Sequence, residues 1–289
     1  MQVTVPVLLG LGVPGLLHLM GFTLIGRWLG SAGMIRKNYQ GENVLTAGGV
    51  FLAVYSAIPA VILFFVSGLE SEATVCLTGS LAAALFGWQD DRSPDRDKEA
   101  KGFRGHLRML WQERRVTSGL WKAVGGGITA LLVSNALCDG FVLVMVTAGL
   151  LALTTNLVNL FDLRPARAIK VFWLLLAISF AVGFPMSVQL SGWGWILPVL
   201  TATILLFPYD ARGRLMLGDT GANYLGFVAG SCLVTNAPFS VQAGLLVLFA
   251  ALHLIAERVS FSRVIQSVEW LRRLDQWGRQ KPRNQTDRM

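Results

Sequence analysis

Charged residues are scarce in this chain. Only 15% of its 289 residues are Asp, Glu, Lys or Arg, whereas 53% are hydrophobic, and the mean hydropathy is +0.55. So little charge excludes a soluble domain of this length and predicts a polytopic membrane protein. No charged residue falls at the middle of a predicted membrane span, which argues against an ion-coupled transporter because transporter sites lie near the bilayer midplane.

Cysteine is also rare. Cys76, Cys138 and Cys232 lack the spacing of metal ligands, and we expect them to fill apolar space near the outer helix ends. A disulfide between Cys76 and Cys138 stays open as an alternative. The first apolar run has no charged region before it and no small-residue cleavage site, which favours a spanning helix over a removed signal peptide.

Long apolar runs make up most of the chain. A helix needs about 17 to 25 apolar residues to cross a bilayer. Such runs can be placed at 3–26, 48–67, 73–88, 119–136, 141–159, 171–188, 193–208, 222–236 and 241–257. They predict an all-α polytopic bundle of about nine spanning helices within residues 1–257.

The residues after the last predicted span follow a different pattern. Over 258–279 one helical stripe is apolar and has arginines around it, which predicts an interfacial amphipathic helix. The stripe consists of Phe261, Val264, Val268, Leu271, Leu274 and Trp277. Residues 280–289 are polar, and we expect them to be disordered.

The basic residues lie on one side of the predicted bundle. Of the 25 Lys and Arg residues, all but Lys122 fall in segments 27–47, 89–118, 160–170, 209–221 and 258–289. The opposite loops hold only Glu70, Glu72 and Asp139 as charges. By the positive-inside rule, the N-terminus should be outside and the C-terminus cytoplasmic. This topology and contact with anionic lipids explain the net charge of +8, and nucleic acid is not needed as a partner.

Asp219 lies in a glycine-rich turn, LMLGDTGANYLG over 215–226, between two apolar runs. The next helix should begin here, so free backbone N–H groups and the helix dipole would face an anion or a metal-bound phosphate. Mg²⁺ would suit the carboxylate, because this ion takes one or two carboxylates and completes its shell with phosphate and water. The alternative is an ordinary helix N-cap. Asn223 follows one turn later on the same side.

Two adjacent carboxylates, Asp90 and Asp91, follow the third predicted span. On a continuing helix they would point about 100° apart, so one could meet a metal or phosphate while the other faces an attacking group or a basic partner. A solvated loop start is the alternative. The basic stretch 101–108, which includes His106, could hold lipid phosphate or rest on anionic headgroups.

A third polar cluster ends the fifth predicted span. Asn156, Asn159 and Asp162 are spaced to lie on one helical face, and Arg164 follows them. Polar groups so near the membrane are costly unless a site or a neighbouring helix satisfies them, and the nearby cations favour a phosphate pocket. In the first inner loop, Lys37 and Asn38 could contact phosphate or a nucleobase, or could anchor the loop at the membrane.

These motifs together resemble the polyprenyl-phosphate N-acetylhexosamine phosphate transferases, the superfamily that includes phospho-N-acetylmuramoyl-pentapeptide transferase. The likeness spans about residues 36–226. It consists of TAGGV at 46–50, DD at 90–91, NLVNLFD at 156–162 and GDTGAN at 218–223. The resemblance implies an enzyme that transfers a sugar phosphate from a cytoplasmic UDP-sugar to polyprenyl phosphate and releases UMP.

The resemblance also implies roles for individual residues. Asp219 and Asp90 would bind Mg²⁺, and Asp90 and Asp91 would deprotonate or position the lipid phosphate and the metal. Asn159 and Asp162 would hold the nucleotide end. Substrate contacts are then expected from Lys37, Asn38, His106, Asn156, Asn159, Asp162, Arg164 and Asn223.

The sequence departs from the family pattern in four respects. Leu163 follows Asp162 where glycine is usual, and Leu45 stands where proline is common. The family's histidine-rich cytoplasmic loop and its final spanning helix have no counterpart. These departures leave a second hypothesis open, namely a catalytically silent relative that binds polyprenyl phosphate or scaffolds an envelope assembly. For either reading we expect a multi-pass protein of the bacterial cytoplasmic membrane, and the sequence leaves open the sugar, the polymer and whether the chain forms a homodimer.

Overall fold

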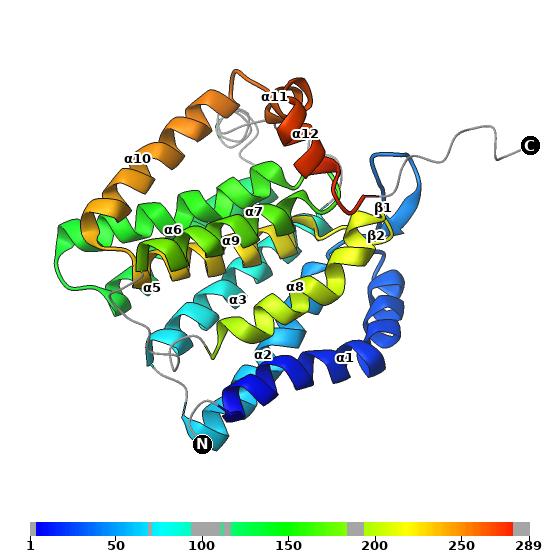
Figure 1. Cartoon of the computed structure of the whole chain (residues 1–289), viewed down its shortest axis with the longest axis horizontal. Coiled ribbons are helices and arrows are strands. Elements are labelled where there is room, and N and C mark those ends of the chain that lie inside the picture. The colour runs from blue at the N-terminus through cyan, green and yellow to red at the C-terminus, as the bar shows by residue number, and fades with distance from the viewer. Residues whose placement is uncertain (1–3, 69–70, 94–110, 112–116, 184–193, 280–289) are drawn as a thin grey trace, which may run out of the picture.

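The computed structural model describes residues 4–68, 71–93, 111, 117–183 and 194–279 (Figure 1). In this part of the chain, helices account for nearly all regular structure, and a single two-stranded hairpin is the exception. The long helices are α1 (Thr4–Ser31), α2 (Gly49–Ser67), α3 (Ser71–Arg92), α5 (Ser118–Leu137), α6 (Phe141–Phe161), α7 (Arg167–Gly183), α8 (Ile196–Ala211), α9 (Gly218–Asn236) and α10 (Phe239–Ala256). The hairpin strands are β1 (Ile35–Lys37) and β2 (Asn43–Leu45).

The all-α prediction is confirmed, and a helix overlaps each of the nine predicted spans. Among the helices of the described residues, five are long and apolar enough to cross a membrane, namely α1, α2, α5, α6 and α10. The other four differ for two reasons. Helices α7 and α8 have only 17 and 16 residues, and α3 and α9 are rich in glycine and in small polar side chains. Small residues favour close helix packing over contact with lipid.

Helix α9 occupies the centre of the bundle, between α2, α3, α6 and α7 (Figure 1). Its residues from Thr220 to Val234 are all buried. Glycine makes this possible, because a Cβ on Gly226 would overlap the backbone of Thr155 in α6. By contrast, only 11% of the apolar stretch of α1 and of α10 is buried, as expected for helices that face acyl chains.

The hairpin joins two glycine-rich segments that are far apart in the sequence. Strands β1 and β2 pair antiparallel, and the carbonyl of Leu45, the last residue of β2, accepts a hydrogen bond from the Met216 N–H at 2.8 Å. The Gly48 N–H in turn donates to the Met216 carbonyl at 2.9 Å. The start of α2 and the turn before α9 are therefore held side by side.

The predicted amphipathic helix over 258–279 is instead two short helices, α11 (Phe261–Ser267) and α12 (Glu269–Gln276). Val268 separates them because its backbone is extended, with φ −103° and ψ 116°. This break lets Phe261 stack on Phe161, with ring centroids 5.1 Å apart, while Trp277 reaches Phe207 at 5.4 Å. Both short helices lie at the end of the bundle that carries the hairpin (Figure 1). The predicted disorder of 280–289 falls outside the described residues.

The packing of α3 on α9 gives a first prediction. A Cβ on Gly87 would overlap the backbone of Asp219 and Thr220, which cannot move as a side chain can. We expect Gly87→Ala to lower the melting temperature of the purified protein by several degrees, since overpacking costs about 1–3 kcal/mol. Gly126→Ala in α5 is the matched control, because nothing lies within 4 Å of a Cβ at that position. Equal melting temperatures for the two variants would show that this close approach is wrong.

Candidate functional site

The site begins where the end of α3 meets the start of α9. Gly218 has φ +67°, a left-handed conformation that glycine adopts without strain, and it starts α9. The Asp91 carboxylate accepts hydrogen bonds from the backbone N–H groups of Asp219 at 3.0 Å and Thr220 at 2.9 Å. The Thr220 hydroxyl donates to it as well, at 2.5 Å. A carboxylate of α3 thus caps the N-terminus of α9, where negative charge is favoured.

This arrangement leaves the carboxylate of Asp219 available for other contacts. The sequence left open whether Asp219 is a functional acid or an ordinary N-cap of its own helix. No side chain of the α9 segment itself caps α9, and Asp91 fills that role from a neighbouring helix. The cap therefore fixes the backbone of Asp219, and the Asp219 side chain is not part of the cap.

Asp219 and Asp90 both contact the same lysine of α5, Lys122. The Lys122 ammonium donates to Asp90 Oδ2 at 3.1 Å and forms an ion pair with Asp219 Oδ2. Asn159 of α6 completes the group. With its amide nitrogen turned toward Asp219, it donates to Oδ1 at 3.0 Å, and its oxygen accepts from Lys122 at 3.3 Å. Side chains from α3, α5, α6 and α9 thereby form one polar cluster.

The charge of this cluster is not balanced. The carboxylates of Asp90 and Asp219 both contact the Lys122 ammonium, which supplies only one positive charge for the two of them. A further cation at this position would favour ionisation of both acids.

A cavity of about 620 Å³ opens beside the cluster. This volume lies in the usual range for small-molecule sites. The lining residues are Ile35, Arg36, Lys37, Asn43, Thr46, Asp91, Asp162, Met216, Gly218 and Asp219. The acids and the two cations of β1 face the same space, and Arg36 Nη2 donates to the Asp91 carbonyl at 3.4 Å. The buried Arg36 Nε has no hydrogen-bond acceptor among the described residues, so it can serve a ligand.

Asp162 connects this cavity to a smaller one. It is the C-cap residue that directly follows α6, and it lines both the large cavity and a pocket of about 60 Å³. Burial raises the pKa of Asp162, and the carboxylates of Asp210, Asp219 and Asp91 raise it further. The smaller pocket also holds Arg164, whose guanidinium lies 5.2 Å from the centre of the Tyr39 ring.

The structure brings together most of the residues predicted for the site. Asp90, Asp91, Asn159, Asp162 and Asp219 lie in the polar cluster or the cavity beside it, and Lys37, Asn38 and Arg164 line the two cavities. Asn38 also has a structural role, because it connects the hairpin turn to the loop after α8. Its amide oxygen accepts a hydrogen bond from the Gln40 N–H at 2.8 Å, and its amide nitrogen donates to the Gly213 carbonyl at 3.3 Å.

Three predicted residues lie elsewhere. Asn156 is exposed one turn before Asn159 and lines neither cavity. Asn223 is only 4% exposed inside α9 and also lines neither cavity. His106 lies outside the described residues.

Two cations of the site were missed from the sequence. Lys122 had a usable signal, because it is a single cation inside an apolar run, where an ionisable group is costly unless it is paired. Arg36 stands next to Lys37 and could not be told from a loop anchor. Its position on β1 makes it a cavity residue.

The donors of the cluster can be tested for their fit to Mg²⁺. Among the described residues, no group of three or more His, Cys, Asp or Glu side chains is placed to hold a metal. However, Asp90 and Asp219 point at one shared ammonium, so two carboxylates converge on one cation position. Mg²⁺ needs only one or two carboxylates when phosphate and water complete its shell. The donor set therefore fits an ion shared with a phosphate substrate and does not fit a closed structural site.

The cap on α9 gives a second prediction. In Asp91→Ala, two buried N–H groups and the Thr220 hydroxyl lose their acceptor. We expect a lower melting temperature and faster amide exchange in the first turn of α9, because loss of a helix cap costs about 0.5–2 kcal/mol. Gln89→Ala, an exposed change on the same helix, should leave both measurements unchanged. Identical exchange in the two variants would rule out the cap.

A scan of the sequence against protein-family models gives no match, and a search of curated protein sequences gives none either.

Proposed function

We propose that this chain is a membrane phosphoglycosyl transferase of the polyprenyl-phosphate N-acetylhexosamine phosphate transferase type. It moves a sugar phosphate, of the N-acetylhexosamine or muramoyl kind, from a UDP-sugar to undecaprenyl phosphate and releases UMP. The observation that carries the proposal is that Asp91, Asp162 and Asp219, from three different helix ends, line one cavity that also contains cations. Asp90 joins this group because it shares the Lys122 ammonium with Asp219. The product would enter cell-wall or surface polymer synthesis.

The charges of the site suit this reaction. A bond forms between an oxygen of the lipid phosphate and the sugar-bearing phosphorus, and the bond from that phosphorus to the oxygen of UMP breaks. Both reactants are anions, so their approach requires positive charge placed in advance. Arg36 and Lys37 line the cavity and can bind phosphate oxygens. Lys122 forms ion pairs with the carboxylates of Asp90 and Asp219.

The acids have distinct roles in this proposal. Asp90 and Asp219 would hold Mg²⁺, which would supply positive charge to offset that of the phosphoryl group. Asp91 keeps the first turn of α9 in place, and Asn159 fixes the orientation of Asp219. Asp162 lines both cavities and Arg164 lines the smaller one, and these two side chains would contact the nucleotide end.

The same proposal includes a topology. All nine long helices cross the bacterial cytoplasmic membrane, with the N-terminus outside and the C-terminus in the cytoplasm. The support is the position of the basic residues, because Arg36 and Lys37 lie on β1 and line the large cavity, and Arg164 lines the smaller pocket that shares Asp162 with it. Asp139 lies in the turn between α5 and α6, at the opposite ends of these helices from Lys122 and Asn159.

A second candidate is a silent relative that binds polyprenyl phosphate without turnover. One observation favours it, because Lys122 pairs with both Asp90 and Asp219 and already supplies a cation at the position proposed for Mg²⁺. In that case the cavity would still bind a lipid phosphate through Arg36 and Lys37. Tight binding of undecaprenyl phosphate with no turnover on any UDP-sugar would identify this candidate.

Turnover tests the enzyme proposal directly. The purified protein with undecaprenyl phosphate, Mg²⁺ and a panel of UDP-N-acetyl sugars should release UMP. Asp219→Asn should reduce this release by about 100-fold or more, because it removes one of the two carboxylates that would hold the metal beside the transferring phosphoryl group. Asp139→Asn is the matched control, since this exposed aspartate lies at the other end of the bundle and should not matter. UMP release that survives Asp219→Asn would refute the assignment.

A further inference from the structure

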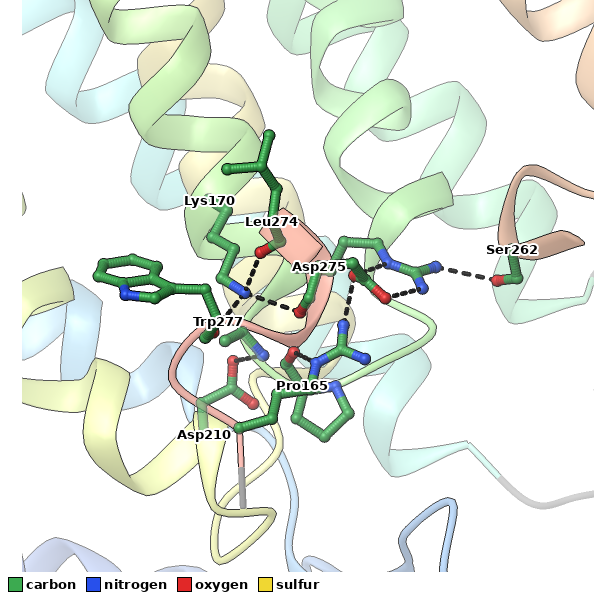
Figure 2. A network of polar contacts seen from close by, with 10 residues as sticks. Pro165, Lys170, Asp210, Ser262, Leu274, Asp275 and Trp277 are labelled. Atoms are coloured by element: carbon green, nitrogen blue, oxygen red, sulfur yellow. Dashed lines mark hydrogen bonds and ion pairs between the residues drawn. The ribbon is translucent and has the colours of Figure 1, made fainter. Parts of the chain in front are cut away.

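The C-terminal helices α11 and α12 are tied to the start of α7 by one buried arginine (Figure 2). Arg167, only 4% exposed, is the first residue of α7. Its guanidinium donates two parallel hydrogen bonds to the Asp275 carboxylate of α12, Nε to Oδ1 at 2.9 Å and Nη2 to Oδ2 at 3.1 Å. Its Nη1 donates to the Ser262 hydroxyl of α11 at 2.9 Å. Bidentate pairs of this kind fix geometry as well as contributing energy.

Asp275 also connects α12 to the loop that lines the candidate site, residues 162–166, here called the Asp162 loop. Asp275 accepts from Arg279 Nη2 at 2.5 Å, and Arg279 Nε donates to the Pro165 carbonyl at 2.8 Å. From the other side, Asp210 accepts a hydrogen bond from the Ala166 N–H at 2.9 Å (Figure 2). The backbone of the loop is thus held between α8 and the end of the C-terminal segment.

The Asp162 loop needs such support. Ala166 has φ +61°, a left-handed conformation that is strained for a residue with a side chain and persists only where its surroundings impose it. Two side chains of the same loop, Asp162 and Arg164, line the candidate site. A contact that holds the loop backbone therefore also fixes the position of groups that face the cavity.

The C-terminal end of α12 is attached at further points. The Lys170 ammonium donates to the carbonyls of Leu274 at 3.0 Å, Asp275 at 2.8 Å and Trp277 at 2.6 Å, which lie at the end of the helix (Figure 2). A cation is favoured at a helix C-terminus. Trp277 also packs on Phe207 of α8. These contacts attach the end of α12 to α7 and α8, although its apolar residues Trp270 and Leu274 remain exposed.

The charge of Asp275 is essential to the network. Burial alone would raise its pKa, but the hydrogen bond from Arg167 and the charges of Arg167 and Arg279 outweigh burial and hold the pKa below its usual range. Asp275 is therefore ionised at neutral pH. Its removal would leave two arginines with like charges facing each other in a partly buried space, which is more costly than loss of an exposed ion pair.

We propose that α11 and α12 form a clamp that, through Asp275, holds the Asp162 loop in position and so sets the affinity of the cavity for a nucleoside-diphosphate sugar. This inference rests on the proposed function for the identity of the ligand. Asp275 is a positioning residue, because it acts on the cavity through Arg167, Arg279 and the loop backbone. Displacement of a binding group by about 1 Å is enough to cost up to 100-fold in activity.

The clamp can be tested with two variants of the full-length protein. Asp275→Asn keeps the size of the side chain and removes its charge. Glu269→Gln is the matched control on α12, because the ion pairs of Glu269 within the described residues are with exposed Arg272 and Arg273. Amide exchange is measured over residues 162–168, and KM and kcat are measured for the UDP-sugar. In Asp275→Asn we expect exchange and donor KM to rise about tenfold, equivalent to about 1.4 kcal/mol, with kcat changed less than donor KM. Glu269→Gln should behave as wild type, and Asp275→Glu should partly restore the donor KM.

Unchanged exchange over 162–168 in Asp275→Asn would overturn the clamp, and so would faster exchange with an unaltered donor KM. If the wild type turns over no donor, the proposed function fails, and the affinity for UMP, measured by calorimetry, replaces KM as the second measurement. If Asp275→Asn unfolds, faster exchange will extend to α5. Arg279→Gln then takes its place, because it breaks the link to Pro165 and leaves the pair of Arg167 and Asp275 intact.

Discussion

The close contact between the last turn of α3 and the first turn of α9 is the interaction on which the rest of the site depends. It requires glycine at Gly87 of α3, because a Cβ there would overlap the backbone of α9, and Gly49 allows α2 to approach the same turn equally closely. The contact is then fixed by Asp91, whose carboxylate accepts both free N–H groups at the start of α9. Asp219 lies in the same turn, so the packing that stabilises the bundle also places this acid beside Asp90.

Electrostatics explain why the polar groups gather at one end of the bundle. Four helices supply the cluster of Asp90, Lys122, Asn159 and Asp219, and each of these side chains lies within a turn or two of a helix end. Ionisable groups farther along these helices would face lipid or a dry core, where they are costly. At the helix ends they can pair with one another and still reach a polar ligand from the cavity.

The sequence predicted the helices well because the signal for a membrane helix is local. The length and hydropathy of each run are properties of consecutive residues. The one-sided distribution of Lys and Arg also predicted which helix ends lie on the same side of the membrane. That was enough to group Asp90, Asn159 and Asp219. Three features depend on partners distant in the chain and could not be predicted: Asp91 capping another helix, Lys122 bridging two acids, and Val268 breaking the amphipathic helix so that Asp275 meets Arg167.

The central claim is that Asp90 and Asp219 share one divalent cation at the end of α3 and the start of α9. Crystals of the full chain soaked in Mn²⁺, a substitute for Mg²⁺ with the same preference for oxygen ligands, test it most directly through anomalous scattering. The account predicts one anomalous peak within bonding distance of both carboxylates, with the Lys122 ammonium displaced from between them. A peak bound elsewhere, or Lys122 still paired with both acids under saturating Mn²⁺, would contradict it.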